Sequence, residues 1–195
     1  CKRYSINYIL PSHNETEILA KYRHLLDDQV CRMIPDVGHC ILFNDKASSY
    51  DYVRSLDIPV PRRFDYESIE ELATALPHVG NFVIKMRTGN SAKGVYYADN
   101  PVEVIARVNQ LIDKYELSPD RYPQIEERVI GEGWGCSALF WHGEHVADFT
   151  HRRLREKVPT GGTSTLREAA VHEGLREAAL RILSSLGWHG LAMCE

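Results

Sequence analysis

Apolar side chains recur every three or four positions in several stretches of the chain, and this spacing predicts amphipathic helices. The clearest helix start is Asn100-Pro101, because the asparagine can cap a helix and the proline suits its first position. Glu103 then places a carboxylate in the first turn, where the helix dipole favours it. The predicted helices span residues 15–31, 44–56, 101–115 and 172–186.

Short apolar runs rich in Tyr, Ile, Val and Phe predict strands, and His142-Gly143 offers a tight turn between two of them. Together the elements predict a mixed α/β protein in two lobes. The first residue is not Met and both ends fall in strand-like runs, so we expect the chain to be part of a longer protein. The predicted strands span residues 4–10, 82–85, 122–130, 136–142, 144–152 and 190–195.

The composition is typical of a soluble globular protein, with 44% hydrophobic and 26% charged residues. No apolar run reaches the roughly 20 residues that a membrane-spanning helix needs, and the start of the chain does not read as a signal peptide. The five cysteines are odd in number and unclustered, which favours a reducing compartment and a cytoplasmic location. The net charge of −4 argues against nucleic acid as a partner.

A loop of unusual composition, RTGNSAKG, follows the apolar run that ends at Lys85. A simple hairpin needs two or three turn residues, so this loop is longer than a sheet requires. Gly89 and Gly94 would let the backbone approach a ligand, and Ser91 adds a hydroxyl donor. Lys85 would place a fixed positive charge beside it. The pattern fits a loop that closes over phosphates, although a solvated loop also accounts for it.

Three further motifs follow the same order as in a known superfamily. The chain contains NDKASSYDYVRSLDIPVP, then QIEERVIGEGWGCSALF, and finally GWHGLAMCE. With the loop after Lys85, these motifs resemble the ATP-grasp superfamily, in particular the carbamoyl-phosphate-synthetase-like and biotin-carboxylase-like carboxylate-amine ligases. The resemblance extends from about Asn44 to Glu195. It implies an α/β (α+β) fold in which two lobes hold a nucleotide between them.

The same resemblance implies a division of the chain into three parts. Residues 1–43 would be the end of a preceding pre-ATP-grasp α/β domain. Residues 44–125 would form the small lobe with the phosphate loop. Residues 126–195 would form the large lobe, which we expect to be incomplete at its C-terminal end.

The resemblance also assigns residues to the phosphates of ATP. Lys46 and Lys85 correspond to the two lysines that hold the phosphates from opposite sides. The loop would close over the β- and γ-phosphates. Its residues with an expected role are Thr88, Gly89, Asn90, Ser91 and Gly94.

Adenine, ribose and metal contacts are implied further along the chain. Glu126 would accept from the adenine amino group, while the Glu127 carbonyl and the Val129 N–H would pair with the adenine edge. Glu132 is the candidate for the ribose hydroxyls. Glu195 would be the first of two acidic ligands for magnesium or manganese, cations that prefer hard oxygen ligands.

The segment HRRLREKVPTGGTST concentrates positive charge before a predicted Thr-Gly-Gly-Thr-Ser turn. On a strand Arg153 and Arg155 share one face, so they could neutralise the charge of a phosphoryl group in transfer. An exposed, charged strand end explains the same residues equally well. The resemblance favours Arg153 and Arg155 as catalytic residues.

The implied activity is an ATP-dependent ligase reaction, in which a carboxylate is phosphorylated to an acyl phosphate that an amine or another nucleophile attacks. The expected partners are therefore nucleotide and small-molecule substrates, without nucleic acid or membrane. A non-catalytic nucleotide-binding module on the same fold, phosphorylation of bicarbonate, and a structural domain without ligand stay open as alternatives. So do the acceptor, and whether the protein forms a homo-oligomer.

Overall fold

The computed structural model describes residues 2–26, 30–89, 92–158 and 161–195. The chain divides into two compact units, each with its own sheet. We call them the middle unit and the terminal unit. The middle unit contains Asn44–Gly131 and Lys157–Thr163, and the terminal unit contains Cys1–Phe43, Glu132–Glu156 and Ser164–Glu195. The division into three parts expected from the sequence stays a prediction.

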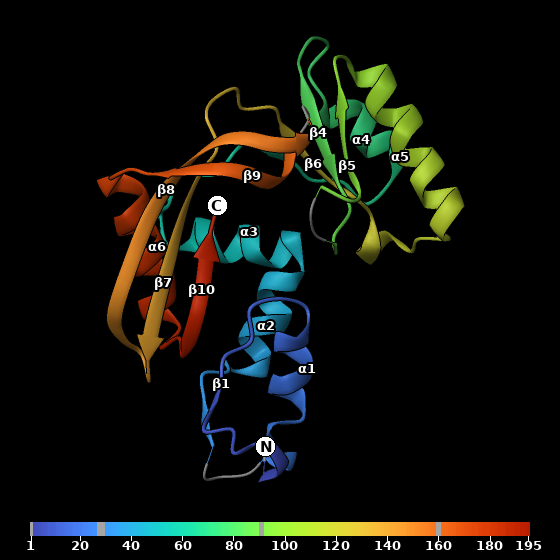
Figure 1. Cartoon of the computed structure of the whole chain (residues 1–195). Helices are drawn as coiled ribbons and strands as arrows, with labels where there is room; N and C mark the ends of the chain where they lie inside the picture. The colour runs from blue at the N-terminus through green and yellow to red at the C-terminus, as the bar shows by residue number, and fades with distance from the viewer. Residues whose placement is uncertain (1, 27–29, 90–91, 159–160) are drawn as a thin grey trace. The chain divides into compact units, whose positions relative to one another are not determined.

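The middle unit is built on a four-stranded sheet in the order β3-β6-β4-β5, in which all neighbouring strands are antiparallel. Helices α4 and α5 lie on one side of this sheet (Figure 1). The elements of the unit are α3 (Lys46–Ser55), β3 (Arg63–Phe64), α4 (Ile69–Ala75), β4 (Phe82–Lys85), β5 (Val95–Ala98), α5 (Pro101–Tyr115), a 3-10 turn (Pro119–Arg121) and β6 (Gln124–Glu127).

Alternation along the strands gives this sheet one apolar and one polar face. Phe82, Ile84 and Ile125 are buried against α5, whose residues Val104 and Val108 are also fully buried. Each such side chain stabilises the unit by roughly 1.5–3 kcal/mol relative to its exposed state. The intervening residues of β4 and β6 include Lys85 and Glu126, so these two charged side chains fall on the opposite face.

Helix α5 confirms the predicted boundaries, 101–115. The Asn100 carboxamide oxygen accepts from the Glu103 N–H at 3.0 Å, and the Glu103 side chain accepts from the Asp99 N–H at 3.0 Å. This reciprocal arrangement satisfies backbone donors at the helix start. The local signals in the sequence were therefore sufficient to place this helix.

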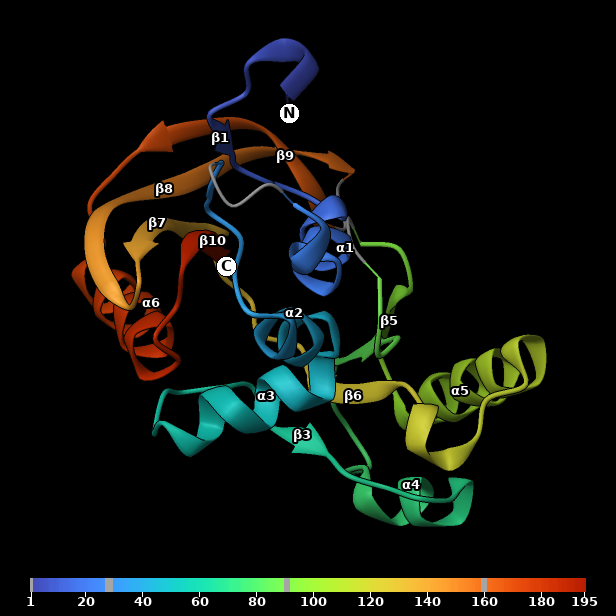
Figure 2. The same cartoon turned by 90° about the horizontal axis from the view of Figure 1, so that it is seen from below.

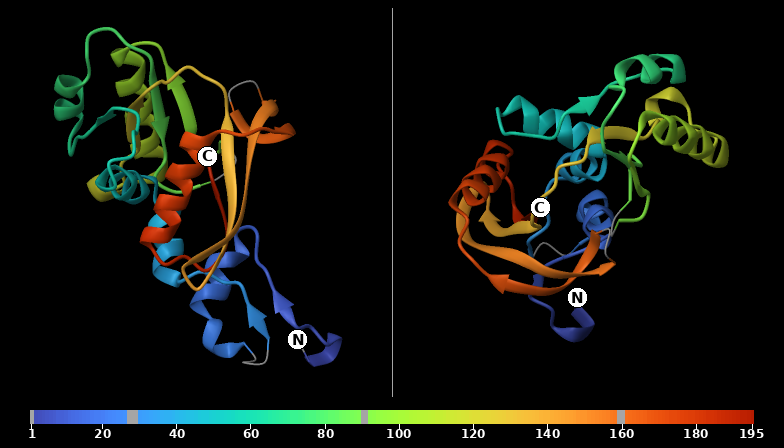
Figure 3. Two further views of the ribbon diagram at one scale, coloured as in Figure 1. Left: turned by 90° about the vertical axis from the view of Figure 1, so that its left-hand side faces the viewer. Right: turned by 90° about the horizontal axis from the view of Figure 1, so that it is seen from above.

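The terminal unit contains a second four-stranded sheet, in the order β10-β7-β8-β9. Helix α6 runs along one face of it (Figure 3), where Ala138 and Phe140 of β7 pack with Leu183 of α6 and with Trp188. Strands β8 and β9 form a long curved ribbon (Figure 2). The elements lying wholly or mostly in this unit are β1 (Tyr8–Ile9), α1 (Glu15–Lys21), β2 (Cys31–Arg32), α2 (Val37–Asn44), β7 (Trp134–Trp141), β8 (Glu144–Val158), β9 (Gly161–Ala169), α6 (Glu173–Ser185) and β10 (Gly190–Cys194), with 3-10 turns at Lys2–Tyr4 and Arg23–Leu25.

The first 43 residues form a small substructure of this unit. Strands β1 and β2 pair in parallel, and Ala20, Ile34 and Cys40 form a separate buried cluster. The His189 imidazole Nε2 lies 2.9 Å from the Arg32 carbonyl oxygen, which joins this substructure to the start of β10.

Several sequence expectations are wrong here. The helix predicted over 15–31 ends at Lys21, and Cys31 belongs to strand β2, because its backbone pairs with Tyr8. Residues 27–29 lie outside the described residues. The predicted strand over 4–10 is reduced to Tyr8–Ile9. The predicted Thr-Gly-Gly-Thr-Ser turn is wrong for residues 161–164, because they belong to β9, and its first residue, Thr160, lies outside the described residues.

Over the described residues, no helix combines the length and the apolar composition that a crossing of the bilayer requires.

Candidate functional site

Lys46 begins helix α3 on the polar side of the middle unit. Asp45 caps the helix, because its carboxylate accepts from the Ser48 N–H at 2.9 Å. The Lys46 Nζ donates to the Gly89 carbonyl oxygen at 2.8 Å. Burial lowers the pKa of Lys46, the positive charge of Lys85 lowers it further, and Asp45 opposes both effects. Two lysine charges are therefore held close enough to repel each other.

Lys85 ends β4 and forms an ion pair with Glu126 of β6, with its Nζ 2.7 Å from Oε2. The Glu126 residue is only 3% exposed. Its other carboxylate oxygen accepts from the Gln124 side chain. Both oxygens of the acid are thus engaged by neighbours on the same polar face, as a buried charge requires.

The base of the glycine-containing loop is fixed to the start of α3. The Arg87 guanidinium contacts the Asp45 carboxylate with Nη2 to Oδ1 at 2.7 Å, and its Nη1 donates to the Asp120 carbonyl oxygen at 3.0 Å. Burial alone would raise the pKa of Asp45, but the hydrogen bonds from Arg87 and Ser48 outweigh it and lower the pKa. The sequence offers Asn44 or Asp45 as the cap of this helix, and the structure confirms Asp45. Arg87 had no role predicted from the sequence, since only the folded chain brings positions 42 apart into contact.

Gly94 is the described glycine of this loop at which an added side chain would clash most closely with its neighbours. It has a φ of +75°, and a Cβ placed on it would lie 2.7 Å from the Met86 Cγ. Only glycine avoids both the strained backbone and the collision. Thr88 and Gly89 are described and exposed, whereas Asn90 and Ser91, which were predicted to contact phosphates, lie outside the described residues.

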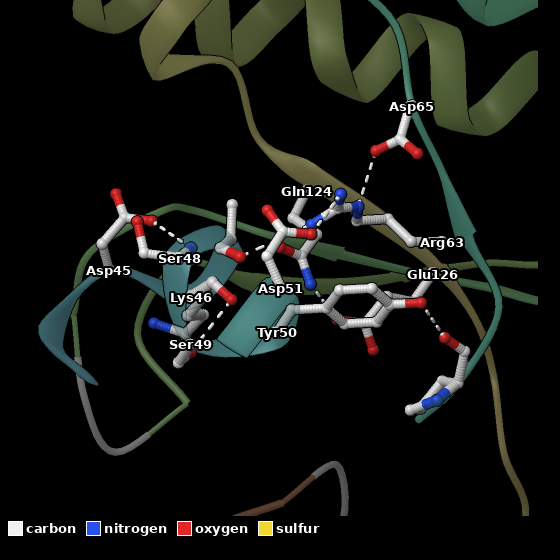
Figure 4. Close-up of polar contacts among 12 residues, drawn as sticks. Asp45, Lys46, Ser48, Ser49, Tyr50, Asp51, Arg63, Asp65, Gln124 and Glu126 are labelled. Atoms are coloured by element: carbon white, nitrogen blue, oxygen red, sulfur yellow. Dashed lines mark hydrogen bonds and ion pairs between the residues drawn. The ribbon is translucent and has the colours of Figure 1, made fainter. Parts of the chain in front are cut away.

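Arg63 holds α3 against the rest of the middle unit (Figure 4). Its Nη2 lies 2.7 Å from the Asp51 Oδ1, and its guanidinium carbon is 4.4 Å from the centroid of the Tyr50 ring. The Tyr50 hydroxyl donates to the Pro61 carbonyl oxygen at 2.7 Å. These contacts position the helix that begins with Lys46.

The predicted adenine-binding segment follows β6. The Glu127 Oε1 accepts from the Arg62 N–H at 2.9 Å, so the Glu127 side chain is held against the backbone just before β3. Val129 is 66% exposed and Ile130 is 77% exposed, an unusual state for two consecutive branched apolar residues. Glu132, predicted for ribose, belongs to the terminal unit and pairs with Arg152, with Oε1 3.3 Å from Nη1.

In the terminal unit the structure brings Arg153 and Glu195 into direct contact. The Arg153 Nη1 also lies 3.0 Å from the Glu156 Oε1. Burial would lower the pKa of Arg153, but the two carboxylates raise it, so the guanidinium stays charged. The Arg155 Nε donates to the Thr165 hydroxyl at 3.0 Å and its side chain is exposed.

Glu195 and the described side chains around it do not form a complete metal site. Its carboxylate contacts Arg153, and within the described part of the chain no group of three His, Cys, Asp or Glu side chains could hold a metal ion. A magnesium ion needs several oxygen ligands in near-octahedral geometry. The described residues therefore do not make up a complete magnesium site.

His151 of β8 is a buried polar residue for which the sequence predicts no role. It is fully buried, and neither ring nitrogen has a hydrogen-bond partner among the described residues. Its ring lies over Gly135 of β7, where a Cβ would be 2.6 Å from Cε1. Burial lowers the pKa of His151, as do the charges of Arg167 and Arg153, while Glu195 opposes them, so the net effect favours the neutral imidazole.

Comparison with known proteins relates this fold to a set of solved enzymes. No protein-family model matches the chain, and no curated protein is similar to it in sequence. The biotin carboxylase domain of 2-oxoglutarate carboxylase from Hydrogenobacter thermophilus superposes with a TM-score of 0.76 over 98% of this chain, at 14% identity. That structure was solved in complex with MgADP, ADP and bicarbonate.

D-alanyl-alanine synthetase A from Vibrio cholerae gives a TM-score of 0.69 over 96% of this chain at 15% identity. The D-alanine-D-alanine ligase from Coxiella burnetii gives 0.66 over 98% at 16% identity. The chain has the ATP-grasp fold. The α/β fold class expected from the motifs is thus confirmed. The chain spans 45%, 62% and 55% of these three proteins, respectively.

Proposed function

We propose that this chain is the nucleotide-binding part of an ATP-dependent ligase, which phosphorylates a carboxylate to an acyl phosphate for attack by an amine or another nucleophile. The observation that carries the proposal is the placement of two lysines at one loop with two glycines, because the Lys46 Nζ donates to the Gly89 carbonyl and Lys85 ends the strand that precedes the loop. The likeness in fold to a protein solved with MgADP supports it.

The two lysines would bind the phosphates of ATP. A phosphate anion between them would relieve their repulsion and would form charge-assisted hydrogen bonds with both ammonium groups. Lys46 already donates to the Gly89 carbonyl, so its position is coupled to the loop that would cover the phosphates. The loop residues proposed to contact phosphate are Thr88, Gly89, Asn90, Ser91 and Gly94.

Adenine would bind at the segment after β6. The Glu127 carbonyl and the Val129 N–H would pair with the adenine edge, and the exposed side chains of Val129 and Ile130 offer apolar surface to the ring. Glu126 would accept from the adenine amino group, which requires its carboxylate to share the hydrogen bonds it now accepts from Lys85 and Gln124. Glu132 is proposed for the ribose.

Arg153 and Arg155 would neutralise the charge that develops during phosphoryl transfer. Glu195 is proposed as a ligand for magnesium, which polarises phosphates when bound. Because the described residues do not make up a complete metal site, the proposal assigns no step to the metal. Bicarbonate is a second candidate acceptor, since the Hydrogenobacter thermophilus structure was solved with it. We further expect the protein in the cytoplasm, from its unclustered cysteines.

Isothermal titration calorimetry with ADP and magnesium tests the proposal. Lys46→Ala and Lys85→Ala should each weaken binding by about tenfold, or about 1.4 kcal/mol, the scale of a lost charge-assisted hydrogen bond. Lys114→Ala, on the exposed side of α5, is the matched control and should leave the affinity unchanged. Binding that is equal in all four proteins, or absent in the unaltered chain, would contradict the proposal.

A further inference from the structure

Arg87 lies where β4 passes into the glycine-containing loop, between Lys85 and Gly89, and its contacts reach back 42 positions to the start of α3. Its carbonyl oxygen accepts from the Lys46 N–H at 2.9 Å. Its guanidinium forms a fork on the Asp45 carboxylate, with Nε 3.0 Å from each oxygen and Nη2 2.7 Å from Oδ1. One residue therefore holds two consecutive positions of the helix start, one through its main chain and one through its side chain.

The guanidinium also reaches a third segment of the middle unit. Its Nη1 donates to the Asp120 carbonyl oxygen at 3.0 Å, in the 3-10 turn that precedes β6. The ion pair is largely shielded from water, since 23% of the Arg87 side chain and 18% of the Asp45 side chain are exposed. Bidentate contacts between a guanidinium and a carboxylate fix geometry as well as charge. Three segments that are distant in sequence are thus joined at one side chain.

Lys46 needs such a support to keep its place at the loop. Its Nζ donates to the Gly89 carbonyl oxygen at 2.8 Å. Burial lowers the pKa of Lys46 and the positive charge of Lys85 lowers it further, while Asp45 opposes both effects. The surroundings therefore disfavour the charged form of Lys46 unless other contacts hold it there. The contacts of Arg87 supply this hold, because they fix the backbone from which the Lys46 side chain extends.

The arginine does more than complete the cap of α3. Asp45 caps the helix by accepting from the Ser48 N–H at 2.9 Å, a bond made without Arg87 (Figure 4). Asparagine is as good a residue as aspartate at this position of a helix. A lysine in place of Arg87 would keep the positive charge, but it lacks the planar fork that bonds two carboxylate oxygens and a carbonyl at once. The acid at the cap and the arginine at the loop therefore form a connection that the helix alone does not require.

We propose that Arg87 is a positioning residue for nucleotide binding, which acts through Lys46 by fixing its backbone and its capping neighbour at the base of the glycine loop. Because these contacts exist without a ligand, Lys46 is already placed for the phosphates and binding does not have to order it. Arg87 itself makes no contact with the nucleotide. The inference rests on the proposed function, since it concerns the phosphate contact that Lys46 makes there.

A thermodynamic cycle on ADP binding tests whether Arg87 acts through Lys46. Isothermal titration calorimetry with ADP and magnesium compares the unaltered chain with Arg87→Lys, Lys46→Ala and the double variant. We expect Arg87→Lys to weaken binding by roughly fivefold or more, because the fork is lost while the charge stays. In the Lys46→Ala background the same substitution should change the affinity by less than about twofold. Arg54→Lys, at an exposed arginine of the same helix, is the matched control and should leave the affinity unchanged.

Asp45→Asn examines the other side of the contact. Asparagine keeps the cap of α3 but removes the carboxylate that the guanidinium holds, so ADP should bind more weakly by a similar factor. Urea unfolding of each variant gives the folded fraction under the conditions of the titration. A loss of affinity is thereby distinguished from a loss of fold.

The outcomes separate this inference from the proposed function. Equal weakening by Arg87→Lys with and without the Lys46 side chain would show that Arg87 acts by another route, and it overturns the proposal. An unchanged affinity in either Arg87→Lys or Asp45→Asn overturns it too. In these cases weaker binding by Lys46→Ala leaves the proposed function intact. If the unaltered chain does not bind ADP, or Lys46→Ala has no effect, the proposed function is contradicted and the role of Arg87 is lost with it.

Discussion

The middle and terminal units each contain a four-stranded sheet with helices packed on one face, yet they treat their polar groups differently. In the middle unit the buried Glu126 is paired with Lys85 and Gln124. In the terminal unit the buried His151 has no hydrogen-bond partner among the described residues. The charge of Glu126 is thus held in a neutralised pair, whereas burial lowers the pKa of His151 and favours its neutral form.

The largest expected effect is loss of the buried ion pair. Glu126→Ala leaves the Lys85 ammonium next to a desolvated void, and removal of one partner of such a pair costs about 3 kcal/mol of unfolding free energy. Glu127→Ala is the neighbouring control, because that side chain is exposed and accepts one backbone hydrogen bond. Its cost should stay below about 1 kcal/mol.

Urea unfolding of the two variants checks this ordering. If Glu126→Ala were no more destabilising than Glu127→Ala, the middle unit would not depend on its buried pair. The contrast between the two units would then disappear.

A smaller effect is expected at the glycine beneath His151. Gly135→Ala places a Cβ 2.6 Å from the imidazole Cε1, and such overpacking costs about 2 kcal/mol of unfolding free energy. Gly131→Ala is the control, since no atom lies within 4 Å of the position that its Cβ would take and the backbone there is not left-handed. The double variant Gly135→Ala, His151→Ala should lose less than the sum of the two single variants.

Additive losses in that thermodynamic cycle would show that the ring does not lie over Gly135.

The smallest effect concerns the pKa of Lys46. Burial and the charge of Lys85 lower this pKa, because both disfavour the ammonium form. A bound phosphate should reverse the second effect, so ADP should raise the pKa of Lys46. Affinity for ADP should then fall as the pH rises through the pKa of free Lys46. NMR titration of the lysine 13Cε signals, with Lys114 as the reference, measures the shift, and an unchanged pKa would place the phosphates elsewhere.

The parts of the fold that depend on local signals could be predicted from the sequence. Helix α5 has its cap, its proline and its apolar stripe within one segment, and both of its ends are as predicted. The segment 15–31 has a similar stripe, but the backbone of Cys31 pairs with Tyr8, 23 positions earlier. Such pairing depends on the tertiary fold and leaves no periodic signature. Residues 161–164 were expected as part of a turn because of their two glycines, but they begin strand β9, which lies next to β8 in the sheet.

The residues of the candidate site also fall into two groups, those that a sequence motif points to and those that only the fold brings together. Lys46 and Lys85 could be identified because each lies in a motif with a defined place in the chain. Arg87 and His151 could not, because their roles depend on which strand or helix end lies opposite them. The unpaired state of a buried group is a property of the folded chain alone.

Hydrogen exchange with mass spectrometry, with and without ADP and magnesium, tests the central claim most directly, because it reports where the nucleotide binds. We predict slower exchange in peptides covering 85–95 and 124–130, and unchanged exchange in 15–21, which belongs to the terminal unit. Slower exchange confined to other segments, or none at concentrations that saturate binding, would contradict the assignment of the phosphate and adenine contacts to the middle unit.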